Sequence, residues 1–365
     1  MVTAVHRPSF PVLASSYALG FIVVCLVVYI LHVAAAILIP FVIAVFVWYL
    51  INAIARGLGK IELGGFSLPR FLCFVLAMSF LVVGLWFTYK LIAANVGEVI
   101  RAAPVYQERF KAFLPQLLAT LPFPPEYQPS VSDLTAFFDF GGFAGELAKI
   151  FSGFAGKAMV VLFYTGFLLY EQQFFGRKLR EMAHDKDTEA RVHRTIRNID
   201  IKIQRYIWVK TLISALTGIA TWLLMQAFDI NFAEFWGVMA FVLHFIPYVG
   251  SISAVILPSI VALVQLGDTS SLVTLTLGLT AIQVFFTSFL DPRMMGDSLN
   301  LSPIFIITSI AAWGVLWGVP GMFLAVPILA MAVIIMSQFK KTRPIAILMS
   351  KTGDMEPDEA SGGAR

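Results

Sequence analysis

Long apolar runs with almost no charge recur along the whole chain, and they constrain its fold more than any other feature. A helix crosses the hydrocarbon core of a bilayer with about 20 apolar residues. The composition agrees, with 59% hydrophobic and 13% charged residues, where a soluble chain has roughly a quarter charged. We therefore predict an all-α, polytopic membrane protein. Its apolar stretches are Tyr17–Ile51, Phe71–Ala93, Ser152–Tyr170, Tyr206–Phe228, Phe235–Leu266, Ser270–Leu290 and Ser302–Ser337.

The lengths of these stretches separate full spans from broken ones. Four contain 19 to 23 residues, which suits a single crossing. The other three contain 35, 32 and 36 residues, too many for one helix and too few for two full spans. We predict that each of these is a hairpin of two short helices. The predicted breaks are Pro40 in the first, Pro247 and Gly250 in the second, and Gly318, Pro320 and Gly321 in the third.

Basic residues between the spans predict the orientation. The segment 171–205 carries nine Lys or Arg, whereas 94–151 carries four basic and six acidic residues. The positive-inside rule places 171–205 and both termini in the cytoplasm and 94–151 outside. The expected parts are an N-terminal hairpin with the first span (1–93), an outer amphipathic segment (94–151), two spans around a basic segment (152–228), a core with two broken hairpins (229–337) and a cytoplasmic tail (338–365).

Two segments between the spans carry amphipathic patterns. In the outer one, Ser130–Asp133 resembles a helix start before an aromatic run at 137–143. That run is expected to lie on the outer leaflet, to pack on a neighbouring subunit, or to form a simple interface belt. In the inner one, Val192 and four isoleucines recur at helical spacing among basic residues, which predicts a helix resting on anionic lipid. Lys210, one turn inside the next span, is expected to snorkel to the surface.

Motifs for several chemistries are absent from the sequence. It contains no H-E-x-x-H, no G-x-S-x-G and no phosphate-binding G-x-x-x-x-G-K-[ST]. The five histidines do not cluster and both cysteines fall in apolar runs. We therefore expect neither an enzyme nor ATP-driven transport by this chain alone, and neither a cofactor nor a metal site. The net charge of +4 is spread over loops, so no nucleic-acid partner is expected.

The second and third broken stretches share a plan. FIPYVG is followed by AVILP at 245–258, and WGVPGM is followed by AVP at 317–327. Paired interruptions of apolar segments indicate a transport site, because freed backbone groups at membrane depth can bind solute or ion. A packed structural kink is the alternative for any single proline. We predict a solute path where the two hairpins meet, lined by His244, Pro247, Tyr248, Gly250, Pro258, Gly318, Pro320, Gly321 and Pro327.

His244 is the titratable candidate within the first of these hairpins. It shares a helix face with Tyr248, four residues on, if the helical turn survives Pro247. A lone histidine inside the membrane can accept a proton, because its pKa lies near neutrality. A simple hydrogen bond to a neighbour is the alternative reading.

The stretch FLDPRMMGDSLNLSP at 289–303 supplies further polar candidates. Asp291 ends a span, Arg293 is expected to pair with it or with Asp297, and Gln283 lies two turns earlier. A helix cap or interface anchor is the alternative for Asp291. Together with Lys210, these residues are the candidates for ion coupling.

Several segments resemble one family, the autoinducer-2 exporter-like (AI-2E) permeases. These segments are residues 49–58, 205–218, 245–263 and 289–330. The last one is specific for the family, because it contains the motifs D-P-R-x-x-G-x-S-L and W-G-x-P-G-M in that order. The chain departs from the family pattern at Ala53 and Ser251, where proline is usual or frequent, so a less sharply bent hairpin is expected. The resemblance implies a bacterial inner-membrane permease that exports a small polar molecule, with autoinducer-2 as the type substrate. It also implies a homo-oligomer, for which a pentamer is one candidate assembly.

Three functions stay open at this point. The first is a secondary transporter or facilitator that exports a small polar solute. The second is a Na⁺ or Li⁺/proton antiporter that uses His244 and Asp291, because the family includes members linked to such exchange. The third is a non-transporting membrane scaffold. The expected partners are the solute, protons or monovalent cations, and membrane lipid.

Overall fold

The structure is a computed structural model that describes residues 10–59, 62–63, 66–120, 141–142, 145, 149, 153–182, 186–296 and 299–353. The described chain is helical apart from a short antiparallel ladder of β1 (Glu62–Leu63) and β2 (Phe66–Ser67). Six described helices are long and apolar enough to cross a membrane. The prediction of an all-α polytopic membrane protein is confirmed. These candidate spans are Ala35–Leu58, Arg70–Ala112, Val192–Ala227, Val249–Leu266, Thr269–Met295 and Val319–Ser337.

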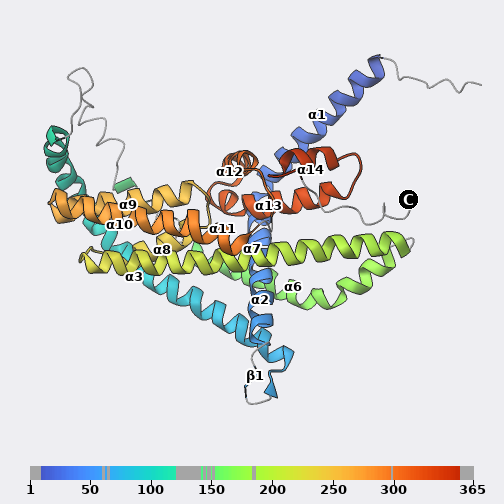
Figure 1. The fold of residues 1–365 in the computed structure, drawn as a ribbon, viewed down its shortest axis with the longest axis horizontal. Helices are drawn as coiled ribbons and strands as arrows, with labels where there is room; N and C mark the ends of the chain where they lie inside the picture. Colours follow the sequence, from blue (N-terminus) through green and yellow to red (C-terminus); the bar gives the residue numbers. More distant parts are fainter. Residues whose placement is uncertain are drawn as a thin grey trace, which may run out of the picture.

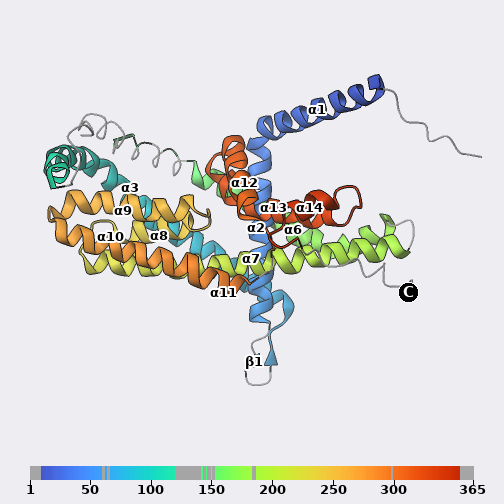
Figure 2. The same cartoon turned by 45° about the horizontal axis from the view of Figure 1, so that its top comes forward.

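The first long apolar stretch is broken, but not at Pro40. Helix α1 (Phe10–Val33) ends one residue before Ala34, and α2 (Ala35–Leu58) contains Pro40 in its interior. Proline is tolerated inside such helices because neighbouring groups can satisfy the freed carbonyl. In both views α1 leaves the end of α2 at a wide angle and does not fold back along it (Figures 1 and 2).

Helix α3 (Arg70–Thr120) continues well past the predicted end of the first span at Ala93. Its extension buries Ala103, Tyr106, Phe110 and Leu114, all 7% exposed or less, at helical spacing. This face packs on helices α8 (Ala233–Leu243) and α9 (Val249–Leu266). Tertiary packing therefore extends the helix past the end of the apolar stretch at Ala93 and into the segment predicted to lie outside the membrane. The predicted helix start at 130–133 and the aromatic run at 137–143 lie outside the described residues, apart from 141–142.

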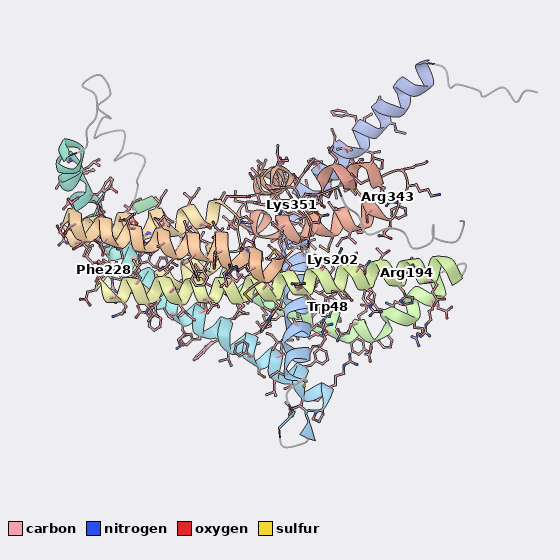
Figure 3. All side chains as sticks on the ribbon, viewed as in Figure 1. Trp48, Arg194, Lys202, Phe228, Arg343 and Lys351 are labelled. Carbon is pink, nitrogen blue, oxygen red and sulfur yellow. The ribbon has the colours of Figure 1, made fainter. Side chains whose placement is uncertain are left out.

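The inner basic segment joins the end of α6 (Phe154–Met182) to the start of α7 (Lys186–Ala227). Helix α7 is continuous, as predicted, and buries Ile203 and Ile207 at 1% exposure each. It runs across the molecule from Arg194 to Phe228 and crosses α2 near Trp48 and Lys202 (Figure 3). Helix α6 is not among the six candidate spans, although Ser152–Tyr170 is predicted as one. Its apolar part ends at Tyr170, where charged residues begin.

Helices α8 (Ala233–Leu243), α9 (Val249–Leu266) and α10 (Thr269–Val284) lie beside the second half of α7 and form a four-helix bundle with it (Figures 1 and 2). The close approach of α7 to α8 depends on two glycines. A Cβ added to Gly218 would lie 2.7 Å from the Gly237 carbonyl oxygen, and one added to Gly237 would lie 2.7 Å from the Trp222 Cβ. Helix α10 continues through a π-helical turn, η1 (Phe285–Leu290), into α11 (Asp291–Met295).

The C-terminal part forms the second broken hairpin and then returns towards the bundle. Helices α12 (Pro303–Trp317) and α13 (Val319–Ser337) meet at Gly318, whose φ is +64°. Helix α14 (Arg343–Met349) follows, and Ser350 pairs with Leu301 in an antiparallel bridge. This pairing joins the residues that follow α14 to the segment between α11 and α12.

Candidate functional site

The hairpin of α8 and α9, called the first hairpin from here on, turns at Pro247 and Tyr248. The hairpin of α12 and α13 is called the second hairpin. The Val249 N–H donates to the Pro247 carbonyl at 2.7 Å, and Tyr248 has φ +62° and ψ −63°. This is a tight γ-turn, a strained conformation for a residue with a side chain. The helical turn therefore does not survive, so the condition for His244 and Tyr248 to share a helix face is not met. His244 is 2% exposed, whereas Tyr248 is 47% exposed.

Both broken hairpins depend on a glycine at the start of their second helix. A Cβ added to Gly250 would lie 1.8 Å from the Leu243 carbonyl oxygen, and one added to Gly321 would lie 2.0 Å from the Trp313 carbonyl oxygen. Distances this short are impossible for a side-chain carbon. The shared plan of FIPYVG and WGVPGM thus corresponds to a shared close approach of two helix ends.

The contact between the two hairpins is apolar. The rings of Phe245 and Phe323 have centroids 4.8 Å apart, and Ile246 packs with Ile310 and Ala325. The tip of the first hairpin thus meets the middle of the second. The break of the second hairpin lies by α1, where the Trp317 indole N–H donates to the Leu31 carbonyl at 2.9 Å.

The prolines and glycines named for the path occupy different surroundings. Pro258 and Pro327 are buried inside α9 and α13. Pro320 begins α13 beside the exposed Gly318. The interface between the hairpins therefore brings together aromatic and aliphatic groups, and the polar groups of the site gather on another side of the first tip.

That polar site is a cluster of four side chains from α7, the end of α8, α10 and α11. Lys210 Nζ lies 2.8 Å from Asp291 Oδ2, and their side chains are 6% and 14% exposed. His244 Nε2 lies 4.0 Å from the same carboxylate oxygen. Gln283 is 4% exposed and is a polar neighbour of His244. We call these residues the four-group cluster.

Two sequence predictions about this cluster are corrected by the geometry. Lys210 does not snorkel to the surface, because its partner Asp291 lies within the protein at hydrogen-bond distance. Arg293 is not the partner of Asp291. Its guanidinium lies 3.6 Å from the ring centroid of Phe289, outside the cluster. Asp297, the other partner considered for Arg293, lies outside the described residues.

The four-group cluster has unused hydrogen-bonding capacity. Among the described residues, both ring nitrogens of His244, both amide atoms of Gln283 and Asp291 Oδ1 are buried without a hydrogen-bond partner. Buried polar atoms almost always find partners in native proteins. A group of them beside a buried ion pair can therefore bind a polar ligand that supplies both donors and acceptors.

A π-helical turn separates Gln283 from Asp291, and sequence reasoning missed it. Such turns are rare and occur frequently at functional sites. The turn η1 is tied to the first hairpin by a 3.2 Å hydrogen bond between the hydroxyls of Thr287 and Ser251. A proline at position 251 would have no hydroxyl to make this bond. No residue pattern marks a π-turn in advance, but the departure at Ser251 is a visible signal of altered local structure.

The family of the chain follows from a sequence match that covers most of its residues. The profile described as "AI-2E family transporter" matches residues 19–341, which include both hairpins and all four cluster residues. The chain belongs to the AI-2E transporter family.

Individual relatives of this AI-2E chain cover nearly its full length. The AI-2 transport protein TqsA of Escherichia coli (strain K12) is 29% identical over 321 residues, 87% of this chain and 90% of TqsA. YhhT of the same strain, named as a candidate transport protein, is 26% identical over 325 residues, 87% of this chain and 89% of YhhT. A candidate transport protein of Haemophilus influenzae is 26% identical over 359 residues, 93% of this chain and 96% of its own.

The AI-2E membership and the six candidate spans together show that the chain is a multi-pass membrane protein of a transporter family. Within the part of the chain that the structure describes, no group of three His, Cys, Asp or Glu residues could hold a metal ion. The polar side chains of the four-group cluster offer hydrogen bonds and charge.

Proposed function

We propose that this AI-2E transporter exports a small polar molecule, such as AI-2, across the bacterial inner membrane, and that the four-group cluster binds it on the way. The observation that carries the proposal is the buried Lys210–Asp291 pair beside the unpartnered polar atoms of His244 and Gln283. Ionisable residues inside membrane segments are costly and mark substrate or ion pathways. The cluster also lies at the break of a discontinuous helix, as solute sites in secondary transporters do.

The relatives support a polar solute without fixing which one. TqsA is named for AI-2 transport, but it is 29% identical to this chain. The proposal includes an orientation with both termini in the cytoplasm, supported by the nine basic residues of 171–205. It also includes a homo-oligomer, which the family resemblance supports.

The test is solute flux in liposomes that contain the purified protein, with and without a proton gradient. A panel of small polar solutes that includes AI-2 is measured for the native chain and for Gln283→Leu. Loss of one or two hydrogen bonds of about 1 kcal/mol each lowers the affinity for the solute by about fivefold to thirtyfold.

Gln172→Leu is the matched control for this experiment. It removes the 2.9 Å hydrogen bond from the Trp48 indole N–H, between α2 and α6 and away from the cluster. We expect this variant to transport within about twofold of the native chain, since it loses one interhelical hydrogen bond of about 1 kcal/mol. Equal flux in the two variants would contradict the assignment of the cluster.

Exchange of Na⁺ or Li⁺ for protons is a second candidate, favoured by the distance of 4.0 Å between His244 and the Asp291 carboxylate. A carboxylate beside an imidazole can exchange a proton for a cation. This function predicts cation-dependent proton flux in vesicles that lack any organic solute. Asp291→Asn is expected to abolish that flux, and an unaffected flux would remove Asp291 from the exchange.

A further inference from the structure

The inner face of α7 carries a buried polar stripe that starts at the four-group cluster. Lys210, Ser214, Thr217 and Thr221 follow one another at spacings of 4, 3 and 4 residues, which places them on one side of a helix. Lys210 is 4% exposed and the other three are 0% exposed. This face is turned into the bundle with α8, α9 and α10, not towards lipid.

Two hydroxyls of this stripe, those of Ser214 and Thr221, lack the backbone hydrogen bond that a helical hydroxyl can make. A serine or threonine inside a helix can donate to the carbonyl four residues earlier. Thr217 does so to Ile213, and Thr165 of α6 does so to Val161, both at 2.8 Å. Ser214 and Thr221 make no hydrogen bond to any described residue, although they are fully buried.

The unpartnered polar atoms are concentrated in this bundle. Nine buried side-chain N or O atoms lack a hydrogen-bond partner within the described ranges, and all nine belong to α7, α8 with its C-cap His244, α10 or α11. Besides the cluster atoms, they are the hydroxyls of Thr211, Ser214 and Thr221 and the indole N–H of Trp236. Random packing defects would be scattered over the whole fold.

The far end of the same bundle is apolar. Met225 and Leu275 are 0% exposed and Leu279 is 1% exposed, and they form one packed group with Phe235 and Trp236. We call these five residues the apolar plug. The polar stripe therefore leads from the four-group cluster to the edge of the plug, where Trp236 contributes its indole N–H.

We propose that the inner face of α7 lines a hydrated route inside the α7–α10 bundle, which runs from the four-group cluster to the apolar plug. Its occupant is water, because water alone satisfies isolated hydroxyls and an indole N–H at several depths of one bundle. The role of this route rests on the transport function proposed above. Its hydration can be measured without any solute.

Cysteine accessibility tests the route. Ser214→Cys and Thr221→Cys are made in a chain with Cys25→Ser and Cys73→Ala, reconstituted in liposomes and treated with a small hydrophilic thiosulfonate. The thiolate attacks the sulfenyl sulfur of this reagent and displaces a sulfinate, and the thiolate forms only where water reaches the thiol. We expect both cysteines to react at least about tenfold faster than two controls, since a buried dry thiol is inert.

The controls separate a hydrated route from a dry core and from lipid. Thr165→Cys replaces a buried hydroxyl that already has a partner, and Leu223→Cys lies on the outside of α7 at 55% exposure. Reaction of Ser214→Cys and Thr221→Cys at the rate of Thr165→Cys would overturn the proposal. Labelling of both cysteines without any solute flux would contradict the transport function and support the hydrated route. Solute flux without labelling would support the transport function and contradict the hydrated route.

A second measurement protects the test against misfolded variants. In a dry core, Thr221→Val removes an unpartnered hydroxyl and raises the melting temperature. In a hydrated route the same change removes a water ligand, so we expect no stabilisation and a loss of solute flux that Thr221→Ser restores. A stabilised Thr221→Val with native flux would contradict the route.

Discussion

At the scale of single residues, the Lys210–Asp291 pair is the feature with the largest consequences. The two side chains are 6% and 14% exposed, and their charges neutralise each other across 81 residues of sequence. Breaking one side of a buried pair leaves an uncompensated charge, whereas removing both charges is often tolerated. The stability of the protein and the role of the pair can therefore be separated experimentally.

Single substitutions in this pair are expected to destabilise the protein and the double substitution to restore it. Asp291→Asn or Lys210→Met alone costs about 3–5 kcal/mol of unfolding free energy, because the remaining charge is buried without its partner. The double variant Lys210→Met/Asp291→Asn returns close to the native melting temperature. Thermal unfolding in detergent checks this, and native stability of both single variants would mean that the pair is not buried.

Tyr248 is the second informative residue, since it holds a positive φ at the tip of the first hairpin. Glycine adopts this conformation without strain, so Tyr248→Gly is expected to stabilise the protein by up to about 1 kcal/mol. Val249→Gly is the control. It changes an equally exposed neighbour that lies in regular helix, and it is expected to destabilise by about 0.5–1 kcal/mol. Destabilisation by both variants would argue against a strained turn.

At the scale of elements, the two broken hairpins share one device, the glycine that lets two helix ends touch. Gly250 and Gly321 each approach a backbone carbonyl too closely for any side chain. The prolines mark where the helices stop, and the glycines determine how closely the second helix returns. The sequence pattern therefore predicts the breaks at 247 and 318–321, but not that one tip faces polar groups and the other faces α1.

Alanine at either glycine is expected to disrupt its hairpin. Gly250→Ala and Gly321→Ala force a Cβ against a backbone oxygen, which costs about 3 kcal/mol or more. Gly84→Ala in α3 is the control, because a Cβ there meets nothing within 4 Å and alanine favours helix. Expression level and thermal unfolding check this, and equal behaviour of the three variants would contradict the close approach.

The start of α10 offers a test of helix capping outside the spans. The Asp268 carboxylate accepts hydrogen bonds from the backbone N–H groups of Ser270 and Ser271 and from the Ser270 hydroxyl. These bonds stabilise the ionised form and hold the pKa of Asp268 well below its usual range. The stabilising contribution is thus complete above the unfolded pKa of about 3.9 and is lost only as the pH falls through the lower folded value.

Asp268→Ala is expected to lower the melting temperature by the same amount from pH 8 to pH 5, and Asp268→Asn by much less, since asparagine also caps helices well. Unfolding curves at several pH values check this. A difference between Asp268→Ala and the native chain that disappears already at pH 6 would contradict the lowered pKa.

At the scale of the whole molecule, local patterns predict the spans and tertiary contacts decide the site. Apolar length is a local property, so each of the six candidate spans overlaps a predicted stretch. Arg70–Ala112 and Val192–Ala227 extend well beyond theirs, and Ala35–Leu58 begins at a different break. The continuation of α3 past Ala93 depends on packing against α8 and α9, which no local pattern records. The partnership of Lys210 with Asp291 is likewise a product of the bundle.

Solute flux through the double variant Lys210→Met/Asp291→Asn is the most direct test of the claim that the four-group cluster binds the solute. Because the two charges are removed together, the variant is expected to fold and to keep its melting temperature. Reconstituted in liposomes beside the native chain, it is predicted to transport the solute at least about tenfold more slowly, the equivalent of 1.4 kcal/mol of lost interaction. Native flux through this folded variant would contradict the claim.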